Sequence, residues 1–144
     1  MSFAHSLPAP YLLTLPQTGE PALGFIAIAE AAALPFPVAR VYWTYLTPDE
    51  VVRGHHAHHR LEQLVFAVSG RLEISLEGPG GQPQEFVLSE PQIGLYIPAM
   101  HWRTVRFRER AVLLCLASEP YDEASYIRDH AEFRALNGLR QPAP

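Results

Sequence analysis

Short apolar runs, separated by turn residues, recur along the chain from residue 8 to residue 98. The clearest run is 71–77, where Leu72, Ile74 and Leu76 alternate with polar or charged residues. A period of two residues is typical of an antiparallel strand that buries one face. Few windows in this stretch show the period of a helix, so we expect the body of the protein to be all-β.

The turn residues divide this pattern into about nine short strands. We place them at residues 24–29, 38–46, 52–59, 63–68, 71–77, 85–88, 93–97, 102–107 and 111–117. Ser69-Gly70 is predicted to form a tight hairpin between two of them, and residues 78–83 a longer polar turn. Closure of these strands into a barrel or jelly roll would hide their edges and enclose a cavity.

The pattern changes after Pro120, where the spacing becomes helical. Asp122 is suited to cap a helix, and Asn137-Gly138 is a stop signal. Between them, residues at three- and four-residue spacing form one face, at Tyr126, His130, Phe133 and Leu136. We expect residues 120–138 to form one or two short helices packed on the barrel.

The length of 144 residues, with 48% hydrophobic content, predicts one domain over residues 1–144 that can enclose a core and a pocket. The ends, 1–10 and 139–144, contain several prolines and are expected to be flexible. The formal net charge is −4, and all eleven cationic residues are arginine, without any basic block. We therefore expect neither nucleic acid nor a membrane surface as a partner.

Three features bear on the compartment. Cys115 is the only cysteine and lies in an apolar run, which predicts a buried thiol and a reducing cytoplasm. The longest apolar stretch, 22–36, contains Glu30 and is too short to span a bilayer. The first 39 residues carry no Lys or Arg, which argues against a secretory leader.

Candidate chemistry is concentrated in residues 53–60, which hold four of the seven histidines. Side chains alternate between the two faces of an extended strand, so His56 and His58 would share one face. His55 and His59 would share the other. A pair of imidazoles on one wall can bind a metal, move protons on a bound substrate, or remain solvated.

One interpretation of the pair is a metal site. The ligand pattern of the cupin barrels is similar to four residues here, namely His56, His58, Glu62 and His101, and such a set suits Fe, Mn, Ni or Zn. In that pattern the acidic ligand usually occupies the position that Gln63 holds in this chain. A one-residue offset turns a strand side chain to the opposite face, and the sequence leaves the register open.

A narrower resemblance covers the chain from about Arg40 to Phe133. Its motifs are Arg53-Gly-His-His56-Ala-His58, Leu61-Glu-Gln63, Gly94-Leu-Tyr96, Trp102, Leu116-Ala-Ser118 and Tyr121-Asp-Glu-x-x-Tyr126-Ile-Arg128. Together they resemble the WxcM-like sugar 3,4-ketoisomerases, which act on thymidine-diphosphate-4-keto-6-deoxyglucose. The resemblance implies a cupin-type double-stranded β-helix (a jelly-roll barrel), no metal or other cofactor, a nucleotide-sugar substrate and a homodimer.

The resemblance also implies that His56 and His58 lie in the active site. Moving a ketone from C4 to C3 requires removal of the C3 proton, an enediol, and return of a proton to C4. A neutral imidazole can do both near neutral pH, and such catalysis contributes about two to four orders of magnitude in rate. We assign His58 as the carbon base and His56 as the partner that shuttles protons between the two oxygens.

The residues around the pair provide the predicted substrate contacts. Arg53 and Arg40 can bind a phosphate or polarise a carbonyl. Tyr42, with Trp43 and Tyr45 on the same strand, can stack on a base or a sugar. The predicted set is completed by Gln63, Trp102 and Arg103.

One departure from the family leaves the substrate open. Relatives usually carry Asp-x-Arg-Gly, whose arginine helps to hold the nucleotide, where this chain has Pro-Ala-Leu-Gly at residues 21–24. Two alternatives therefore remain beside the isomerase. They are a metal-binding cupin, either an oxygenase or a metal-dependent isomerase, and a non-catalytic sugar-binding cupin.

Overall fold

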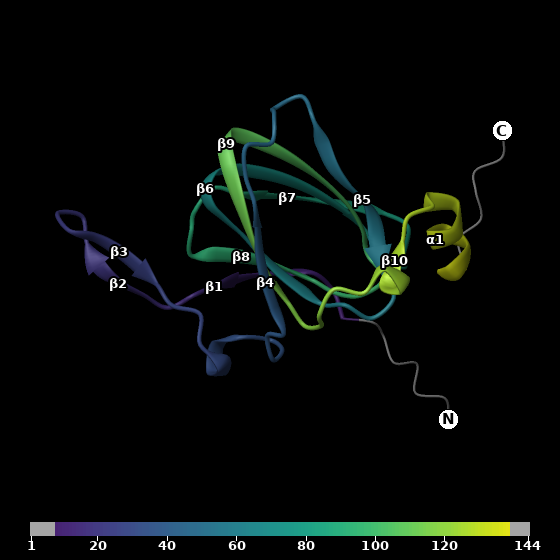
Figure 1. Ribbon diagram of the computed structural model, residues 1–144, viewed down its shortest axis with the longest axis horizontal. Helices are drawn as coiled ribbons and strands as arrows, with labels where there is room; N and C mark the ends of the chain where they lie inside the picture. The colour runs from purple at the N-terminus through teal and green to yellow at the C-terminus, as the bar shows by residue number, and fades with distance from the viewer. Residues whose placement is uncertain (1–7, 139–144) are drawn as a thin grey trace.

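The computed structural model describes residues 8–138, in which β-strands predominate (Figure 1). The strands are β1 (Tyr11–Thr14), β2 (Gln17–Glu20), β3 (Gly24–Ala27), β4 (Arg40–Thr44), β5 (Val52–His58), β6 (Gln63–Glu77), β7 (Pro83–Leu88), β8 (Ile93–Ile97), β9 (Trp102–Ala117) and β10 (Tyr126–Ile127). The helices are the 3-10 turns η1 (Ala31–Ala33) and η2 (Glu123–Ser125) and the α-helix α1 (His130–Leu136). Residues 1–7 and 139–144, which belong to the ends expected to be flexible, lie outside the described residues.

Two long strands, β6 and β9, organise the fold. They pair antiparallel from Gln63 opposite Ala117 to Glu77 opposite Trp102. At one end β8 and β4 flank this pair, and at the other end β7 and β5 flank it. With β1 beside β8 and β10 beside β5, two connected layers result, β1-β8-β6-β9-β4 and β7-β6-β9-β5-β10. The predicted all-β jelly roll is confirmed.

The hairpin predicted at Ser69-Gly70 is wrong, because β6 continues through these residues as one strand. Gly70 has a φ of 70°, and a Cβ there would lie 2.6 Å from the Cα of Ala111 on β9. Glu109 and Arg110 of β9 also have positive φ angles, opposite the same point. The glycine therefore marks a bulge where both long strands bend from one layer into the other. Each pair of short strands expected here is one continuous strand.

Alternate residues of the long strands fill the interior between the layers. The inward set includes Val65, Ala67, Leu72, Ile74 and Leu76 of β6, with Val105, Phe107, Leu113, Cys115 and Ala117 of β9. The residues between them, such as Leu64 and Leu116, pack outside the barrel under Leu15 and Phe36. Because Gln63 lies two residues before Val65, its side chain faces the interior.

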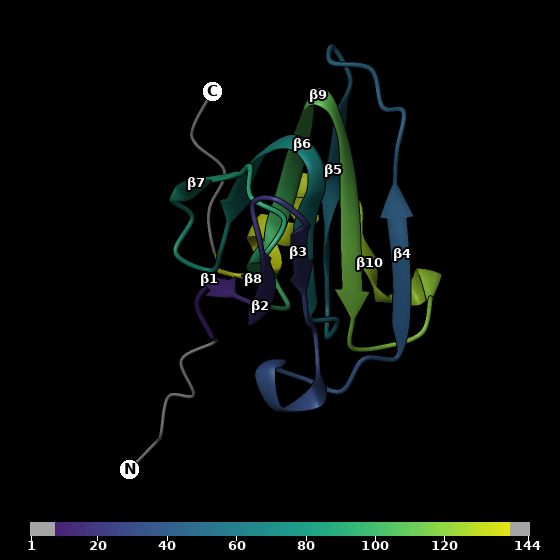
Figure 2. The same cartoon turned by 90° about the vertical axis from the view of Figure 1, so that its left-hand side faces the viewer.

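Of the three N-terminal strands, β3 was predicted, at residues 24–29, whereas β1 and β2 were missed. β2 and β3 form a separate two-stranded sheet that projects from the barrel (Figures 1 and 2). Its apolar side chains stay accessible, with Leu23 85%, Phe25 58% and Ile26 64% exposed. Strands of four residues bounded by proline or glycine, such as β1 and β2, are too short to display a period.

The C-terminal tail contains short helices, as predicted, but their bounds differ from the expected pattern. Asp122 does act as a cap, but of the short turn η2, where its carboxylate accepts from the Ala124 amide at 3.0 Å. The chain then forms β10, and Tyr126 pairs with His58 instead of lying on a helix. Helix α1 begins later, because Asp129 provides its cap by accepting from the Glu132 amide at 2.9 Å. No helix in the described part of the chain is long and apolar enough to cross a membrane.

Candidate active site

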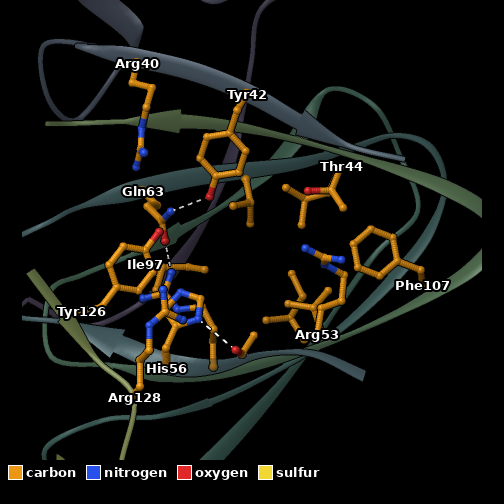
Figure 3. Close-up of a pocket in the computed structure, with 16 residues that line it drawn as sticks. Arg40, Tyr42, Thr44, Arg53, His56, Gln63, Ile97, Phe107, Tyr126 and Arg128 are labelled. Carbon is orange, nitrogen blue, oxygen red and sulfur yellow. Dashed lines mark hydrogen bonds between the residues drawn. The ribbon is translucent and has the colours of Figure 1, made fainter. Parts of the chain in front are cut away.

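A pocket of about 390 Å³ opens between the two layers (Figure 3). Its polar wall is made by Arg40, Tyr42, Arg53, His56, Gln63, Arg103, Tyr126 and Arg128. Six of these eight residues were predicted from the sequence as catalytic or substrate-binding. The structure brings them together from β4, β5, β6 and β9, whereas Tyr126 and Arg128 come from the tail.

A β-bulge in β5 turns Arg53 and His56 toward the same pocket. Strict alternation would instead place Arg53 on the face of His55, opposite His56. Gly54 has a φ of 97° and His55 a φ of 54°, and the pairing with β9 shifts register between Gly54 and His56. A Cβ at Gly54 would lie 2.7 Å from the carbonyl oxygen of Arg103, so glycine is required there.

His56 and His58 share one wall, as predicted, and their rings meet edge to face with centroids 4.9 Å apart. Tyr126 contacts both rings, at 5.0 Å from His56 and 4.3 Å from His58. His56 lines the pocket, whereas His58, the predicted carbon base, is not among the lining residues and is only 1% exposed. The pairing of β10 with β5 therefore packs an aromatic ring against the two imidazoles.

Both imidazoles are held in the neutral form. Burial, and then the charge of Arg103, lower the pKa of His56 to about 4 and the pKa of His58 to about 2. The Nδ1 atom of His56 lies 2.9 Å from the Gly54 carbonyl, which can only accept, so Nδ1 carries the proton. The Nε2 atom of a neutral His56 is therefore free to take up a proton.

Gln63 sits at the centre of a buried polar network, and Figure 3 shows its hydrogen bond with Tyr42 as a dashed line. Its Oε1 accepts a hydrogen bond from Arg103, and its Nε2 donates to the Tyr42 hydroxyl at 2.9 Å and to the Cys115 Sγ at 3.4 Å. Arg103 also donates to the His101 carbonyl at 3.2 Å. These partners of Arg103 carry no charge, so its cation lies beside the histidines without a counter-ion among them. Burial also raises the pKa of Tyr42, whose hydroxyl is therefore protonated at neutral pH.

Two further arginines stand at the pocket mouth against aromatic rings. The Arg40 guanidinium lies 5.2 Å from the ring of Tyr42 and 5.6 Å from that of Tyr121. Arg128 lies 4.2 Å from the Tyr126 ring and pairs with Glu123 at 2.8 Å. The hydrogen bond from Arg128 lowers the pKa of Glu123 to about 2. With Arg53 and Arg103, these side chains make the pocket electropositive and suited to an anionic ligand.

The alternative set of metal ligands is not assembled. The carboxylate of Glu62 accepts a hydrogen bond from Tyr96, whose ring packs outside the barrel. The ring of His101 is buried against Gly78, and its Nδ1 donates to the Ala99 carbonyl at 2.9 Å. Within residues 8–138, no three His, Cys, Asp or Glu side chains gather in a way that could hold a metal ion.

Two sequence interpretations need correction. Trp102 was predicted to contact substrate, but it packs beneath α1, with ring centroids 4.9 Å from His130 and 5.8 Å from Phe133. Tyr126 was placed on a helix face, although both Tyr126 and Arg128 line the pocket. The sequence signal that could have placed them in the site was their motif, which is part of the family resemblance.

Known proteins resemble this chain over most of its length. The family model described as "FdtA: WxcM-like, C-terminal" matches residues 10–138. The TDP-4-oxo-6-deoxy-alpha-D-glucose-3,4-oxoisomerase of Aneurinibacillus thermoaerophilus is 37% identical over 110 residues, which cover 76% of this chain and 78% of that protein.

Solved structures agree with that match. The sugar 3,4-ketoisomerase QdtA of Thermoanaerobacterium thermosaccharolyticum, in complex with TDP, has a TM-score of 0.84 at 31% identity, covering 90% of this chain and 94% of that one. The TDP-quinovose 3,4-ketoisomerase WlaRB of Campylobacter jejuni has a TM-score of 0.79 at 37% identity, covering 86% and 95%. With a family match over nearly all the described residues and a cupin-like fold shared with these relatives, the chain belongs to the FdtA family of WxcM-like proteins.

Proposed function

We propose that this protein is an isomerase that moves the keto group between C4 and C3 of a nucleotide-linked 4-keto-6-deoxy sugar. The observation that carries the proposal is the pair of neutral imidazoles, with ring centroids 4.9 Å apart, of which His56 lines an electropositive pocket. Relatives that are 31% to 37% identical are named for 3,4-isomerisation of TDP-linked sugars. No nucleic acid or membrane partner enters the proposal.

The reaction needs proton transfer only. In the proposed mechanism His58 removes the C3 proton, which the C4 carbonyl acidifies, and the electron pair moves through an enediolate onto the C4 oxygen. His56 passes a proton between the C3 and C4 oxygens, and His58 returns a proton to C4. The C3 oxygen becomes the ketone, and atoms and electrons balance without an oxidant.

Arg103 has two effects in this mechanism. Its charge is close enough to lower the pKa of both histidines, which keeps them unprotonated and able to act as bases. A fixed cation in a buried site also stabilises negative charge that develops on an enediolate oxygen. We therefore assign Arg103, held by Gln63, to the oxygen side of the reacting carbons.

The remaining arginines are suited to the diphosphate. Arg53 lies with Thr44 and Phe107 at one end of the pocket, away from His56, whereas Arg40 and Arg128 lie nearer the histidine end (Figure 3). A diphosphate carries charge that guanidinium groups bind through paired hydrogen bonds. We assign these three side chains to the nucleotide part of the substrate. Tyr42 is assigned to the sugar, beside the reacting carbons.

The test is turnover of TDP-4-keto-6-deoxyglucose in D₂O, followed by proton NMR. We expect the 3-keto isomer with deuterium at C4, because the base exchanges its proton with solvent. The variant H58N should bind TDP in calorimetry and give no isomer. Wild-type protein that binds TDP without exchanging the C3 proton would instead be the non-catalytic sugar-binding cupin. One equivalent of Fe, Mn, Ni or Zn, with activity lost on chelation, would favour the metal-binding alternative.

We further propose that the protein is a homodimer, joined through the β2–β3 sheet and the outer face of β4. An isolated two-stranded sheet is at best marginally stable in water. On β4, Val41 is 50% and Trp43 60% exposed, and an apolar groove of about 540 Å³ lies between Val41 and the segment 29–38. A second copy related by a two-fold axis would cover both surfaces at once.

Sedimentation equilibrium tests the dimer. We expect twice the 16.1 kDa mass of one chain at micromolar concentration. The substitution Phe25→Asp should give monomers, because it places a charge in the contact. Val87→Asp is the matched control, since Val87 is 50% exposed, close to the 58% of Phe25, but lies on β7, away from the proposed contact. A wild-type monomer, or a dimer that survives Phe25→Asp, contradicts the proposed contact.

We also propose a cytoplasmic location. Burial raises the pKa of the Cys115 thiol to about 11, and a free buried thiol is typical of proteins in a reducing compartment. Fractionation of the source cells with an antibody against the protein tests this location.

A further inference from the structure

We infer that Ser125 is a positioning residue that sets which nitrogen of His58 carries the proton. The inference rests on the proposed function, because it describes how the base of that site is prepared. Ser125 lies at the end of η2, is 6% exposed, and places its Oγ 3.4 Å from the Nδ1 atom of His58. No part of the sequence pattern had distinguished this serine.

The direction of the hydrogen bond follows from counting protons. A serine hydroxyl has one proton to donate. Ser125 donates it to the carbonyl of Asp122, at 2.8 Å. Toward His58 the Ser125 oxygen can then only accept, so the proton of a neutral His58 sits on Nδ1. The other ring nitrogen, Nε2, keeps its lone pair.

The surroundings of Nε2 favour the same tautomer. This atom is buried and has no hydrogen-bond partner within residues 8–138. A proton there would be a buried donor without an acceptor, which folded proteins avoid. A bare Nε2 is instead the form that a carbon base requires. The Nδ1 contact is long at 3.4 Å, and such contacts in ligand-free enzymes commonly shorten when substrate binds.

The tail holds Ser125 in place from both sides. Before it, the Asp122 carboxylate caps η2 through the Ala124 amide at 3.0 Å. After it, the Ser125 carbonyl accepts from the His59 amide at 2.9 Å, and β10 pairs with β5. The serine is thus fixed to the strand that carries the base, so the tail sets the proton position on a residue of the barrel.

The primary experiment measures the tautomer directly and needs no turnover. Proton and nitrogen-15 NMR of histidine-labelled, full-length protein at neutral pH distinguishes a protonated ring nitrogen from a bare one, with H58N giving the assignment. We expect the proton on Nδ1 of His58. A proton on Nε2 overturns the inference, even if the protein proves to be an isomerase. A confirmed tautomer stands even if the substrate proves to be another sugar.

Variants then test the cause. Ser125→Ala removes the acceptor, so we expect a mixture of His58 tautomers and a kcat lowered about tenfold with KM changed less than about twofold. Ser125→Thr keeps the hydroxyl and should restore both the tautomer and kcat. An unchanged tautomer and kcat in Ser125→Ala overturn the inference.

A second variant separates the effect of the Ser125 hydroxyl from the effect of the η2 turn. Asp122→Ala weakens the η2 cap but keeps the Asp122 carbonyl and the Ser125 hydroxyl. We expect a lower Tm and an unchanged His58 tautomer. A shift of the tautomer as large as that of Ser125→Ala would assign the effect to the turn and overturn the inference. If Ser125→Ala does not fold, Ser125→Thr and the wild-type tautomer still decide the question.

Discussion

The histidines of β5, together with His59 just after its end, lie in different surroundings on the two faces of the chain. On the inner face, His56 and His58 lie beside Arg103 and Tyr126, and burial lowers the pKa of both. On the outer face, His55 and His59 are exposed to solvent, and the Nε2 atom of His55 lies 3.2 Å from the Val52 carbonyl. The four residues lie within five positions of one another. Their difference shows that the layer packed against a strand, and not the local sequence, decides whether the ring of a histidine is buried and its pKa lowered.

The largest expected effect is on turnover when the inner pair is changed. His58→Asn and His56→Asn should each lower kcat by about two to four orders of magnitude, because each removes a proton carrier of the reaction. Steady-state kinetics with TDP-4-keto-6-deoxyglucose measure this, and calorimetry with TDP checks that binding survives. A kcat within about tenfold of wild type for both variants would contradict the assignment of the pair.

The second effect concerns Arg103, whose charge lowers the pKa of both inner histidines. Arg103→Gln should lower kcat by about a hundredfold, the scale on which one oxyanion donor contributes. It should also move the acid limb of the kcat/KM profile to higher pH, because the cation no longer lowers the pKa of His56 and His58. The limb stays below about pH 6.5, since burial still acts.

A matched control exists on the same strand. Arg106 is exposed, lies three residues after Arg103 on β9, and lines no part of the pocket. Arg106→Gln should leave both kcat and the position of the acid limb unchanged. An acid limb that does not move in Arg103→Gln would mean that Arg103 does not act on the histidines.

A third effect is on stability in acid. Above about pH 6.5 neither the folded nor the unfolded chain protonates His56, so the shift has no effect there. Below it the unfolded chain takes up a proton that the folded chain, with a pKa of about 4, does not. The free energy of unfolding should therefore fall by on the order of 2 kcal/mol between pH 7 and pH 5 from His56, and His58 acts in the same direction. Urea unfolding at both pH values, compared with His56→Asn, measures the difference, and equal losses would refute it.

The smallest effect is expected on the outer face. His55→Asn and His59→Asn should change kcat and KM by less than about twofold, because neither side chain faces the pocket. Asparagine also tolerates the positive φ at position 55, so the bulge in β5 survives. A loss comparable to that of the inner pair in His59→Asn would erase the distinction between the two faces.

The fold was largely predictable because strand alternation is a local property. The strand at 93–97 was placed with the bounds that the structure shows, and β5 differed only by one residue at its end. The errors came where a glycine can mark either a turn or a bulge, as at Gly70. Both uses need a positive φ, and only the strand across from the glycine decides between them.

The candidate site was predictable in part. His56, Gln63, Arg103, Tyr42, Arg40 and Arg53 all line the pocket, as expected. Trp102 and His58 are not among the lining residues, because α1 packs over Trp102 and His58 is only 1% exposed. Tyr126, Arg128 and Ser125 were missed, because their tail adds a strand to β5 where the sequence suggested a helix.

The sequence by itself determined that the chain is an all-β domain and that His56 and His58 share a face, since a two-residue period settles both. Only the tertiary structure decided that Gln63, and not Glu62, faces the interior, because that register depends on the pairing of β6 with β9. It also decided that Arg53 joins the pair, since the bulge at Gly54 overrides simple alternation. Burial, and then the charge of Arg103 on another strand, lower the pKa of both histidines, and only folding creates these surroundings.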